Sequence, residues 1–360
     1  SQHGARLAST GDPATRRPGD PAYNLTLPIA GKRVMTPTPL LALKQLSFVY
    51  RTEPALRCID WTVRTGEHWA CLGLNGAGKT TLAKIISRQL THYSGVMKRG
   101  PALDEGGVAY VCFEQAKALC ERDRKLDDSE FRADATDTGT TVRSMLLGRR
   151  PPCPAFEALV ARLRLGEVLD RGIRFISTGE LRKTLLASAL LRDPALLILD
   201  SPLDGLDLAS QEEMRRLLDE LTRTGTSIVL LCRQAEDIPH GFTHVMLLHQ
   251  GRIADQGGRG AVLARPANQR LLAPAMPSPG ALPPPATRSY PVPGVGPLLE
   301  LRSVTISYGE LTVFENLDWT LDRGRHCSIS GPNGCGKSTL LSLITGDSHK
   351  AYGQDITLFG

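Results

Sequence analysis

The stretch that decides the fold reads GLNGAGKT at residues 73–80, and its pattern returns as GPNGCGKS at residues 331–338. Both fit the spacing G-x-x-x-x-G-K-[ST] of a phosphate-binding loop. Glycines let the backbone wrap closely around an anion and present several N–H donors to it. A helix that starts at the end of such a loop offers its positive N-terminal end to the same anion. The sequence therefore predicts two sites for a nucleotide's phosphates, each placed after a strand and before a helix.

The two loops supply the candidate nucleotide-binding residues. Lys79 and Lys337 are expected to reach the outer phosphates, and Thr80 and Ser338 are expected to ligate Mg²⁺. One such match could be a plain glycine turn, but two at equivalent points of a repeat argue against that alternative. The candidates are Gly73, Asn75, Gly76, Gly78, Lys79, Thr80, Thr81, Gly331, Asn333, Gly334, Gly336, Lys337, Ser338 and Thr339.

Around the first loop, strand-like and helix-like segments alternate as far as about residue 263. Residues 41–50, 61–64 and 68–72 are predicted strands, and residues 80–89 are the predicted helix that follows the loop. This alternation is typical of a mixed α/β domain with a largely parallel central sheet.

The pattern restarts in the last sixty residues. Residues 299–308 resemble residues 41–50, and Trp319 occupies the place of Trp61. Such an internal duplication indicates two copies of one domain. We expect a nucleotide-binding domain over residues 39–264 and the N-terminal part of a second, truncated copy over residues 298–360.

Two segments lack any amphipathic period. Residues 1–38 are rich in Gly, Pro, Ser, Thr and Arg and are predicted to be disordered; Met35 is interpreted as the true initiator. Residues 265–297, which include Pro283-Pro284-Pro285, are predicted to form an extended proline-rich linker.

Composition excludes several classes of protein. The net charge of +6 suits a phosphate-bearing partner and a solvated surface equally well. No apolar run approaches the roughly 18 to 20 residues that cross a bilayer, so any membrane role is predicted to be peripheral. The eight cysteines lie far apart without a C-x-x-C pair and are expected to be reduced. Together with the absence of an apolar signal core, this predicts a cytoplasmic protein, with attachment at the inner face of the cell membrane left open.

Other motifs follow the first loop in a fixed order. Alone, each is weak, because a lone Gln or Tyr is usually a surface or packing residue and an aspartate after a strand often caps a helix. In this order, residues 40–264 and 298–360 resemble the ATP-binding cassette family of ATPases. The motifs are Tyr50 and Tyr308 after strands, Gln115 after residues 108–113, Ser177-Thr178-Gly179-Glu180 before a helical stretch, Asp200 after residues 196–199, and Asp204-Gly205-Leu206-Asp207.

The resemblance implies a P-loop NTPase fold with a helical subdomain, ATP and Mg²⁺ as cofactors, and a role for each motif. It implies that Tyr50 and Tyr308 stack on adenine and that Ser177, Thr178, Gly179 and Glu180 form the signature loop. The residues that it implies to be catalytic are Lys79, Gln115, Asp200 and Lys337, and those that it implies to ligate the metal are Thr80, Gln115, Asp200 and Ser338.

Within the family, the likeness is to ModF-type tandem cassettes, which are linked to molybdate transport. It rests on residues 113–115, 177–186, 340–347 and 358–360. It implies two fused cassettes in one ATPase.

Two positions depart from the family pattern. Ser201 stands where the family has a glutamate that polarises the attacking water, and Arg233 stands where it has a histidine. A serine cannot act as a general base near neutral pH, and the fixed charge of arginine makes it a poor proton relay. The first site is therefore expected to hold nucleotide and to hydrolyse it weakly.

Three functions remain open. The chain could be the energy-coupling ATPase of an importer, working with a separate membrane permease and pairing its two cassettes within one chain or as a homodimer. It could instead be a soluble ATP-driven switch or a regulatory nucleotide-binding protein with weak turnover. Tandem cassettes that resemble translation factors join their domains by a long charged helix, whereas residues 265–297 are proline-rich. Transport, of molybdate by the resemblance, is therefore the favoured function, and no specific nucleic-acid partner is predicted.

Overall fold

The computed structural model describes residues 38–125, 139–273, 296–308, 311–331 and 333–359. The predictions for residues 1–37, including the start at Met35, lie outside the described residues, as does the linker prediction for residues 274–295.

The first unit is built on a six-stranded central sheet. Its strands run in the order β5-β6-β7-β3-β8-β9, and all neighbours are parallel except β8 and β9. Strands β3, β6 and β7 are buried along their whole length, which explains their near-continuous apolar sequences. The predicted α/β class with a largely parallel sheet is confirmed. The strands are β3 (His68–Leu72), β5 (Val108–Cys112), β6 (Leu196–Asp200), β7 (Ser227–Cys232), β8 (His244–His249) and β9 (Arg252–Gly258).

A second, antiparallel sheet has the order β2-β1-β4. Strand β1 (Pro39–Tyr50) pairs with β2 (Glu53–Arg64) on one side and with β4 (Ser94–Arg99) on the other. The sequence indicated β1 and the end of β2 as strands, but it did not predict a sheet separate from the central one.

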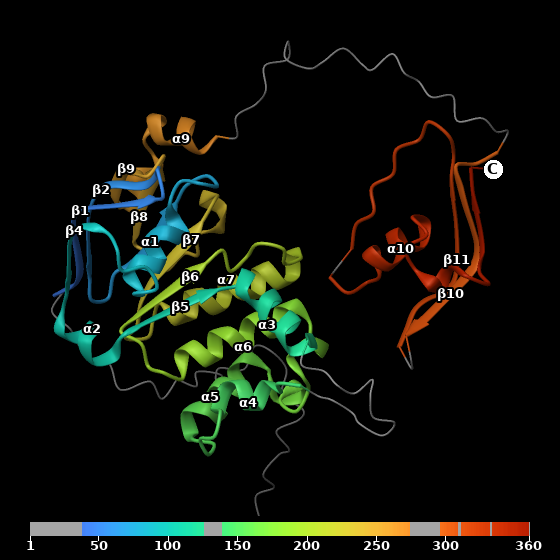
Figure 1. The fold of residues 1–360 in the computed structure, drawn as a ribbon, viewed down its shortest axis with the longest axis horizontal. Coiled ribbons are helices and arrows are strands. Elements are labelled where there is room, and N and C mark those ends of the chain that lie inside the picture. The colour runs from blue at the N-terminus through green and yellow to red at the C-terminus, as the bar shows by residue number, and fades with distance from the viewer. Residues whose placement is uncertain (1–37, 126–138, 274–295, 309–310, 332, 360) are drawn as a thin grey trace, which may run out of the picture.

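Helix α1 (Lys79–Ile86) lies between the two sheets (Figure 1). Its buried side chains include Leu82 and Ile85, which join one apolar cluster with Leu43 and Trp61 of the antiparallel sheet and Ile198 of the central sheet. The helix that follows the phosphate loop is thus fixed on both faces.

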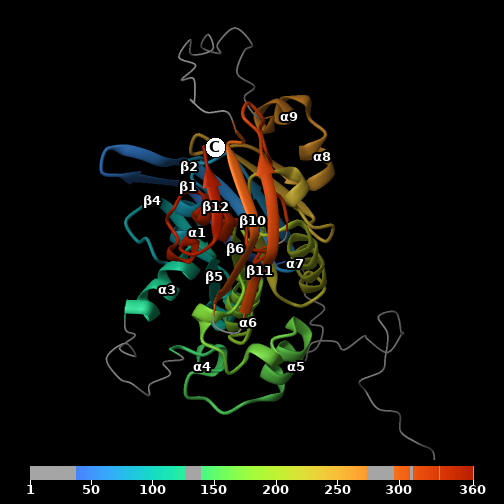
Figure 2. The same cartoon turned by 90° about the vertical axis from the view of Figure 1, so that its right-hand side faces the viewer.

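The other face of the central sheet is covered by helices. Leu186 and Leu218 pack there in a second apolar cluster that also contains Leu197 and Leu230. The helices α4 and α5 gather beyond α6 at the end of the unit far from the antiparallel sheet (Figures 1 and 2). The helices are α3 (Glu114–Lys125), α4 (Val142–Leu147), α5 (Pro154–Leu163), α6 (Thr178–Leu190) and α7 (Leu208–Leu221), with 3₁₀ turns at Gly166–Val168, Ile173–Phe175 and Ala235–Asp237.

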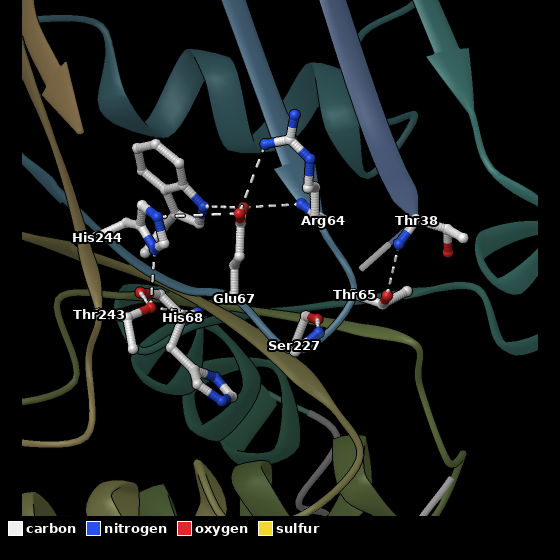
Figure 3. A network of polar contacts seen from close by, with 10 residues as sticks. Thr38, Arg64, Thr65, Glu67, His68, Ser227, Thr243 and His244 are labelled. Atoms are coloured by element: carbon white, nitrogen blue, oxygen red, sulfur yellow. Dashed lines mark hydrogen bonds and ion pairs between the residues drawn. The ribbon is translucent and has the colours of Figure 1, made fainter. Parts of the chain in front are cut away.

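A polar network joins the two sheets at the end of β3 remote from the phosphate loop (Figure 3). The Glu67 carboxylate accepts hydrogen bonds from the Arg64 backbone N–H at 2.9 Å and from Trp69 Nε1 at 3.0 Å. The Trp69 ring stacks on His244 of β8 with centroids 4.7 Å apart. One carboxylate thereby ties the end of β2 to two strands of the central sheet.

The first unit ends with short helices. Helix α2 (Pro101–Gly106) contacts β1 of the antiparallel sheet. Helices α8 (Arg259–Leu263) and α9 (Pro266–Leu272) follow β9. An extended chain was expected for residues 266–272, and that expectation is wrong. Pro266 occupies the first helical turn, where it is tolerated, and the buried Asn268 side chain donates to Val262 O at 2.8 Å.

The second unit repeats the antiparallel sheet. Strand β10 (Leu299–Tyr308) pairs with β11 (Leu311–Leu321) and β12 (Asp355–Leu358), as β1 pairs with β2 and β4. Helix α10 (Lys337–Ile344) and a 3₁₀ turn at His349–Ala351 complete it.

The strand expected before the second phosphate loop is not formed, because residues 326–331 have no sheet partner. In the first unit, the equivalent β3 is held between β7 and β8. A strand exists only through hydrogen bonds to its neighbours, and the described residues of the second unit contain no counterpart of those two strands.

Two expectations from composition can be compared with the structure. Among the described residues, no helix has the length and apolarity needed to span a bilayer. All eight cysteines lie in described segments, and none forms a disulfide. Burial raises the pKa of the Cys71 thiol to about 12, so this thiol stays protonated at neutral pH.

Candidate nucleotide-binding site

The first phosphate loop follows β3 directly and leads into α1. Gly78, the residue that caps α1, has φ of 104°, a left-handed conformation that costs glycine little. A Cβ atom at this position would lie 2.7 Å from Ala55 O and 2.8 Å from Leu56 Cδ2. The loop therefore needs glycine both for its backbone angle and for its close approach to β2.

Lys79 folds back over its own loop. Its Nζ donates to Gly73 O at 2.6 Å and to Leu74 O at 3.1 Å, and the side chain is buried. The loop carbonyls thus place a positive charge at the N-terminus of α1, where the helix dipole also favours an anion.

A carboxylate from the sheet meets this helix. Asp200, the last residue of β6, accepts a hydrogen bond from Thr80 Oγ1 at 2.8 Å on its Oδ2 atom. The same oxygen accepts the hydroxyl of Tyr110 from β5 at 2.9 Å. Burial, followed by the charge of Asp200, raises the pKa of Tyr110, so the phenol remains a donor.

Gly78, Lys79, Thr80 and Asp200 line a cavity of about 430 Å³. Tyr50, which is 46% exposed, lies at its edge with its ring 4.7 Å from that of Phe48. Of the residues predicted from the first loop, all but Gly73 line the cavity. The lining residues are Tyr50, Ala55, Asn75, Gly76, Ala77, Gly78, Lys79, Thr80, Thr81, Cys112, Asp200, Ser201, Asp204 and Arg233.

The two residues that depart from the family pattern also line this cavity. Ser201 directly follows Asp200 and has φ of 52°. Arg233 forms an ion pair with Asp204, with Nε 3.8 Å from Oδ2 and both side chains close to half exposed. The cavity therefore offers two cationic side chains, Lys79 and Arg233, and a carboxylate beside a threonine hydroxyl.

Ser177, Thr178, Gly179 and Glu180 do not line the cavity. They begin helix α6 with a capping box, in which Ser177 Oγ accepts from the Glu180 N–H at 3.2 Å and Glu180 Oε2 accepts from the Ser177 N–H at 2.7 Å. Ser177 and Thr178 are exposed. The capping box thus determines where α6 begins, and the first residues of this helix are exposed at the surface.

Two predicted residues are only partly described. Gln115 lies in helix α3 and Tyr308 ends β10, but the side chains of both are outside the described part of the chain. Their predicted roles stay predictions.

The second phosphate loop repeats the glycine conformations of the first at two positions. Gly334 and Gly336 have φ of 84° and 95°, compared with 78° and 104° at Gly76 and Gly78. Lys337 Nζ donates to Gly331 O at 2.8 Å, as Lys79 does to Gly73 O. Ser338 and Thr339 follow in helix α10, in the places of Thr80 and Thr81.

This second loop contacts the first unit. The Asn333 N–H donates to Asp207 Oδ2 at 3.1 Å, and Asn333 Nδ2 donates to Gly205 O at 3.0 Å. The Ser210 backbone N–H, followed by that of Asn333, lowers the pKa of Asp207. Two segments that are 126 residues apart in the sequence are brought together here.

A second hollow of about 500 Å³ lies beside the Glu67 network, bordered by Lys44, Arg64 and Gln256. Glu67 and Trp69, at the start of β3, line it, whereas the phosphate loop follows the other end of that strand. At this hollow the Trp69 indole donates a hydrogen bond to the Glu67 carboxylate. We therefore interpret the network as one that holds the two sheets together.

Sequence reasoning missed two residues near the site. Tyr110 reaches Asp200 from the neighbouring strand, and the buried Arg182 donates to two backbone carbonyls just after Asp200, those of Pro202 and Asp204. A polar group in the apolar strand sequence VAYVC was the available signal for Tyr110. No local signal pointed to Arg182, because charged residues are common on amphipathic helices.

The geometry agrees with the comparison to known proteins. Residues 56–204 and 314–358 match the sequence model of the ABC transporter family. The chain belongs to the ABC transporter family. The two matched segments correspond to the first cassette up to the turn after Asp200 and to the second phosphate loop with its flanking strands.

Two relatives illustrate the range of this family. The ABC transporter ATP-binding protein ModF of Escherichia coli (strain K12) is 32% identical over 327 residues, which cover 89% of this chain and 65% of that protein. The zinc import ATP-binding protein ZnuC of Halorhodospira halophila is 31% identical over 246 residues, which cover 68% of this chain and 86% of that protein. The chain thus spans less than two thirds of the length of ModF.

Solved structures share the fold. A nucleotide-free ATP-binding cassette from an ABC transporter superposes with a TM-score of 0.52 at 17% identity, covering 66% of this chain and all of that one. At this identity the likeness establishes the P-loop cassette fold alone.

Proposed function

We propose that this chain binds Mg-ATP in its first cassette and couples the binding and slow hydrolysis of that nucleotide to a membrane permease. The observation that carries the proposal is the meeting of Lys79, Thr80 and Asp200 in one cavity, at the start of a helix whose loop has the backbone of a phosphate cradle. A transport role is supported by membership in the ABC transporter family.

The residues present fit a magnesium ion. The Thr80 hydroxyl and the Asp200 carboxylate lie 2.8 Å apart, and hard oxygen ligands of this kind are those that Mg²⁺ prefers. When bound, Mg²⁺ would neutralise charge that develops on the phosphates. Tyr110 of β5 donates to the same carboxylate oxygen of Asp200 as Thr80 and so helps to hold that carboxylate in place.

Slow turnover is supported by the chemistry of the cavity wall. Ser201 carries no charge and cannot take a proton from water near neutral pH. Arg233 offers a permanent positive charge that suits phosphate binding but not proton transfer. This composition favours retention of nucleotide over rapid hydrolysis, so a regulatory nucleotide-binding role is the second candidate.

The Asn333 contact supports pairing of the two cassettes within one chain. The second phosphate loop meets the turn at Gly205 and Asp207, in the same unit that carries the exposed helix start Ser177–Thr178. A homodimer would instead place that surface against a second copy. Sedimentation of the chain with and without Mg-ATP distinguishes these arrangements, since only a homodimer doubles the mass.

Replacing Lys79 with methionine is expected to weaken Mg-ATP binding at the first site by about 30-fold, from loss of about 2 kcal/mol of charge-assisted hydrogen bonding. Isothermal titration of the chain, carried out with Lys337→Met in both proteins so that only the first loop is measured, checks this value.

Lys84→Met is the matched control. Lys84 lies on the same helix but does not line the cavity, so its loss should leave the affinity within about twofold. Equal affinities in the Lys79→Met and Lys84→Met proteins would refute the assignment of this cavity to ATP.

For the transported substrate we infer molybdate, on the likeness to ModF-type tandem cassettes and the 32% identity to ModF. Zinc is the competing candidate, because a zinc import protein is 31% identical. Deleting the gene and measuring cellular molybdenum and zinc separates them. A fall in molybdenum alone supports the inference, and a fall in zinc alone overturns it.

A further inference from the structure

The residues 202–207, here called the 202–207 turn, touch both the nucleotide cavity and the second cassette. Asp204 forms the ion pair with Arg233 at the cavity wall. Gly205 O and the Asp207 carboxylate bind Asn333 of the second phosphate loop. Residues that hold this turn in place therefore also affect the contact between the two cassettes.

Arg182 of helix α6 holds the turn from inside the first unit. Its guanidinium donates through one terminal nitrogen to Pro202 O and through the other to Asp204 O. The side chain is only 8% exposed. A Cβ atom on Gly205 would lie 3.9 Å from the same guanidinium, so Arg182 borders the residue whose carbonyl receives Asn333.

A third contact fixes the guanidinium itself. Its carbon lies 5.1 Å from the centre of the Phe113 ring, in a cation–π arrangement. Phe113 follows β5 directly and precedes helix α3. Burial lowers the pKa of Arg182, while the charge of Asp204 raises it. The planar guanidinium carries five N–H donors, so it can bind two carbonyls at its edge and a ring at its face at the same time.

We propose that Arg182 is a positioning residue that sets the 202–207 turn so that Gly205 and Asp207 can bind Asn333 of the second cassette. The proposal rests on the pairing of the cassettes within one chain that the proposed function includes. Arg182 links the signature helix α6, the residue before α3 and the cassette contact through one buried group. It touches neither the phosphate loop nor Asp200 in the described structure, so its effect on nucleotide is indirect.

Hydrogen–deuterium exchange on the full chain, resolved to the Asn333 amide, tests the proposal. Arg182→Met is expected to speed exchange at Asn333 at least tenfold, because both carbonyl contacts are lost. Arg182→Lys keeps the charge but not the fork and is expected to give an intermediate rate. Amides of β6, residues 196–200, report on the fold of the first unit and should change less than twofold.

Lys183→Met is the matched control. Lys183 is the next residue of α6 and pairs with Glu213 of α7 at 2.7 Å, away from the turn. Its loss should leave exchange at Asn333 unchanged.

Two results would overturn the proposal alone: an Asn333 amide that stays protected in both Arg182 variants, or β6 amides that exchange faster by the same factor as Asn333. An Asn333 amide that is unprotected already in the wild-type chain would overturn the pairing of the cassettes as well. The outcome at Asn333 in the wild type thus separates failure of the proposed function from failure of the role of Arg182.

Discussion

Ser201→Glu is expected to raise ATP turnover at the first site by about 10²- to 10⁴-fold, which corresponds to about 3 to 5 kcal/mol of activation barrier. Ser201 lines the cavity next to Asp200, so a carboxylate at this position lies beside the proposed Mg-ATP site. Serine already holds φ of 52° there, and glutamate has a Cβ of the same kind, so the substitution adds little backbone strain.

Steady-state phosphate release, measured with Lys337→Met present so that only the first loop turns over, gives the rate. Because a glutamate in water titrates near pH 4.3, the gained activity should also fall on acidification, and this limb of the pH profile identifies the new group as the base.

Ser201→Gln separates charge from size. Glutamine has the length of glutamate but cannot accept a proton, so its rate should stay at the level of the unchanged chain. If the Glu and Gln variants hydrolyse ATP equally fast, the missing base is not what limits the first site.

Because its pKa is about 4 in the folded state and 6.5 ordinarily, His68 is expected to make the first unit about 3 kcal/mol less stable at pH 4 than at pH 7. Burial lowers the pKa of His68 to about 4 from an ordinary value of 6.5, opposed only in part by a hydrogen bond to the Thr222 backbone. The side chain lies at the start of β3 with its ring 6.1 Å from that of Phe242.

The sign follows from the two pKa values. Above pH 6.5 the imidazole is neutral in both the folded and unfolded states and contributes no pH dependence. As the pH falls from 6.5 towards 4, the unfolded chain binds a proton that the folded chain does not, so the free energy of unfolding declines by up to about 1.4 kcal/mol per pH unit. Below pH 4 both states are protonated and this decline stops.

Urea unfolding of wild type and His68→Gln at several pH values between 4 and 7 measures this effect. Glutamine can keep a hydrogen bond to the Thr222 backbone and does not titrate. The free energy of unfolding of His68→Gln should therefore vary less with pH than that of the wild type between pH 4 and 7, by the contribution of one bound proton. His92→Gln, at an exposed position, should follow the wild type. Parallel curves for wild type and His68→Gln would show that another group causes any acid sensitivity.

The sequence was sufficient for the central elements because their signals are local. The loop at residues 73–80 needs glycines at fixed positions, and the structure shows why at Gly78, where both φ and space exclude a side chain. The run 196–199 is apolar throughout because β6 is buried on both faces. The repeat of the antiparallel sheet was readable because β10 and β11 carry the same pattern as β1 and β2.

Other features depend on partners far away in the chain. Residues 326–331 have the sequence of a strand but no neighbours to pair with, and residues 266–272 form a helix where proline indicated an extended chain. Tyr110 donates to Asp200, which lies 90 residues further along the chain. Arg182 donates to the 202–207 turn, 20 and 22 residues further along.

By itself, the sequence determined the phosphate cradle, the class of the fold and the duplication, because each depends on backbone angles and periodicities that neighbouring residues set. Only the tertiary structure decided which side chains meet at Asp200, which group holds the 202–207 turn and where Asn333 of the second copy docks. Those contacts join residues whose separation along the chain carries no signal, and they form only when the sheets and helices pack.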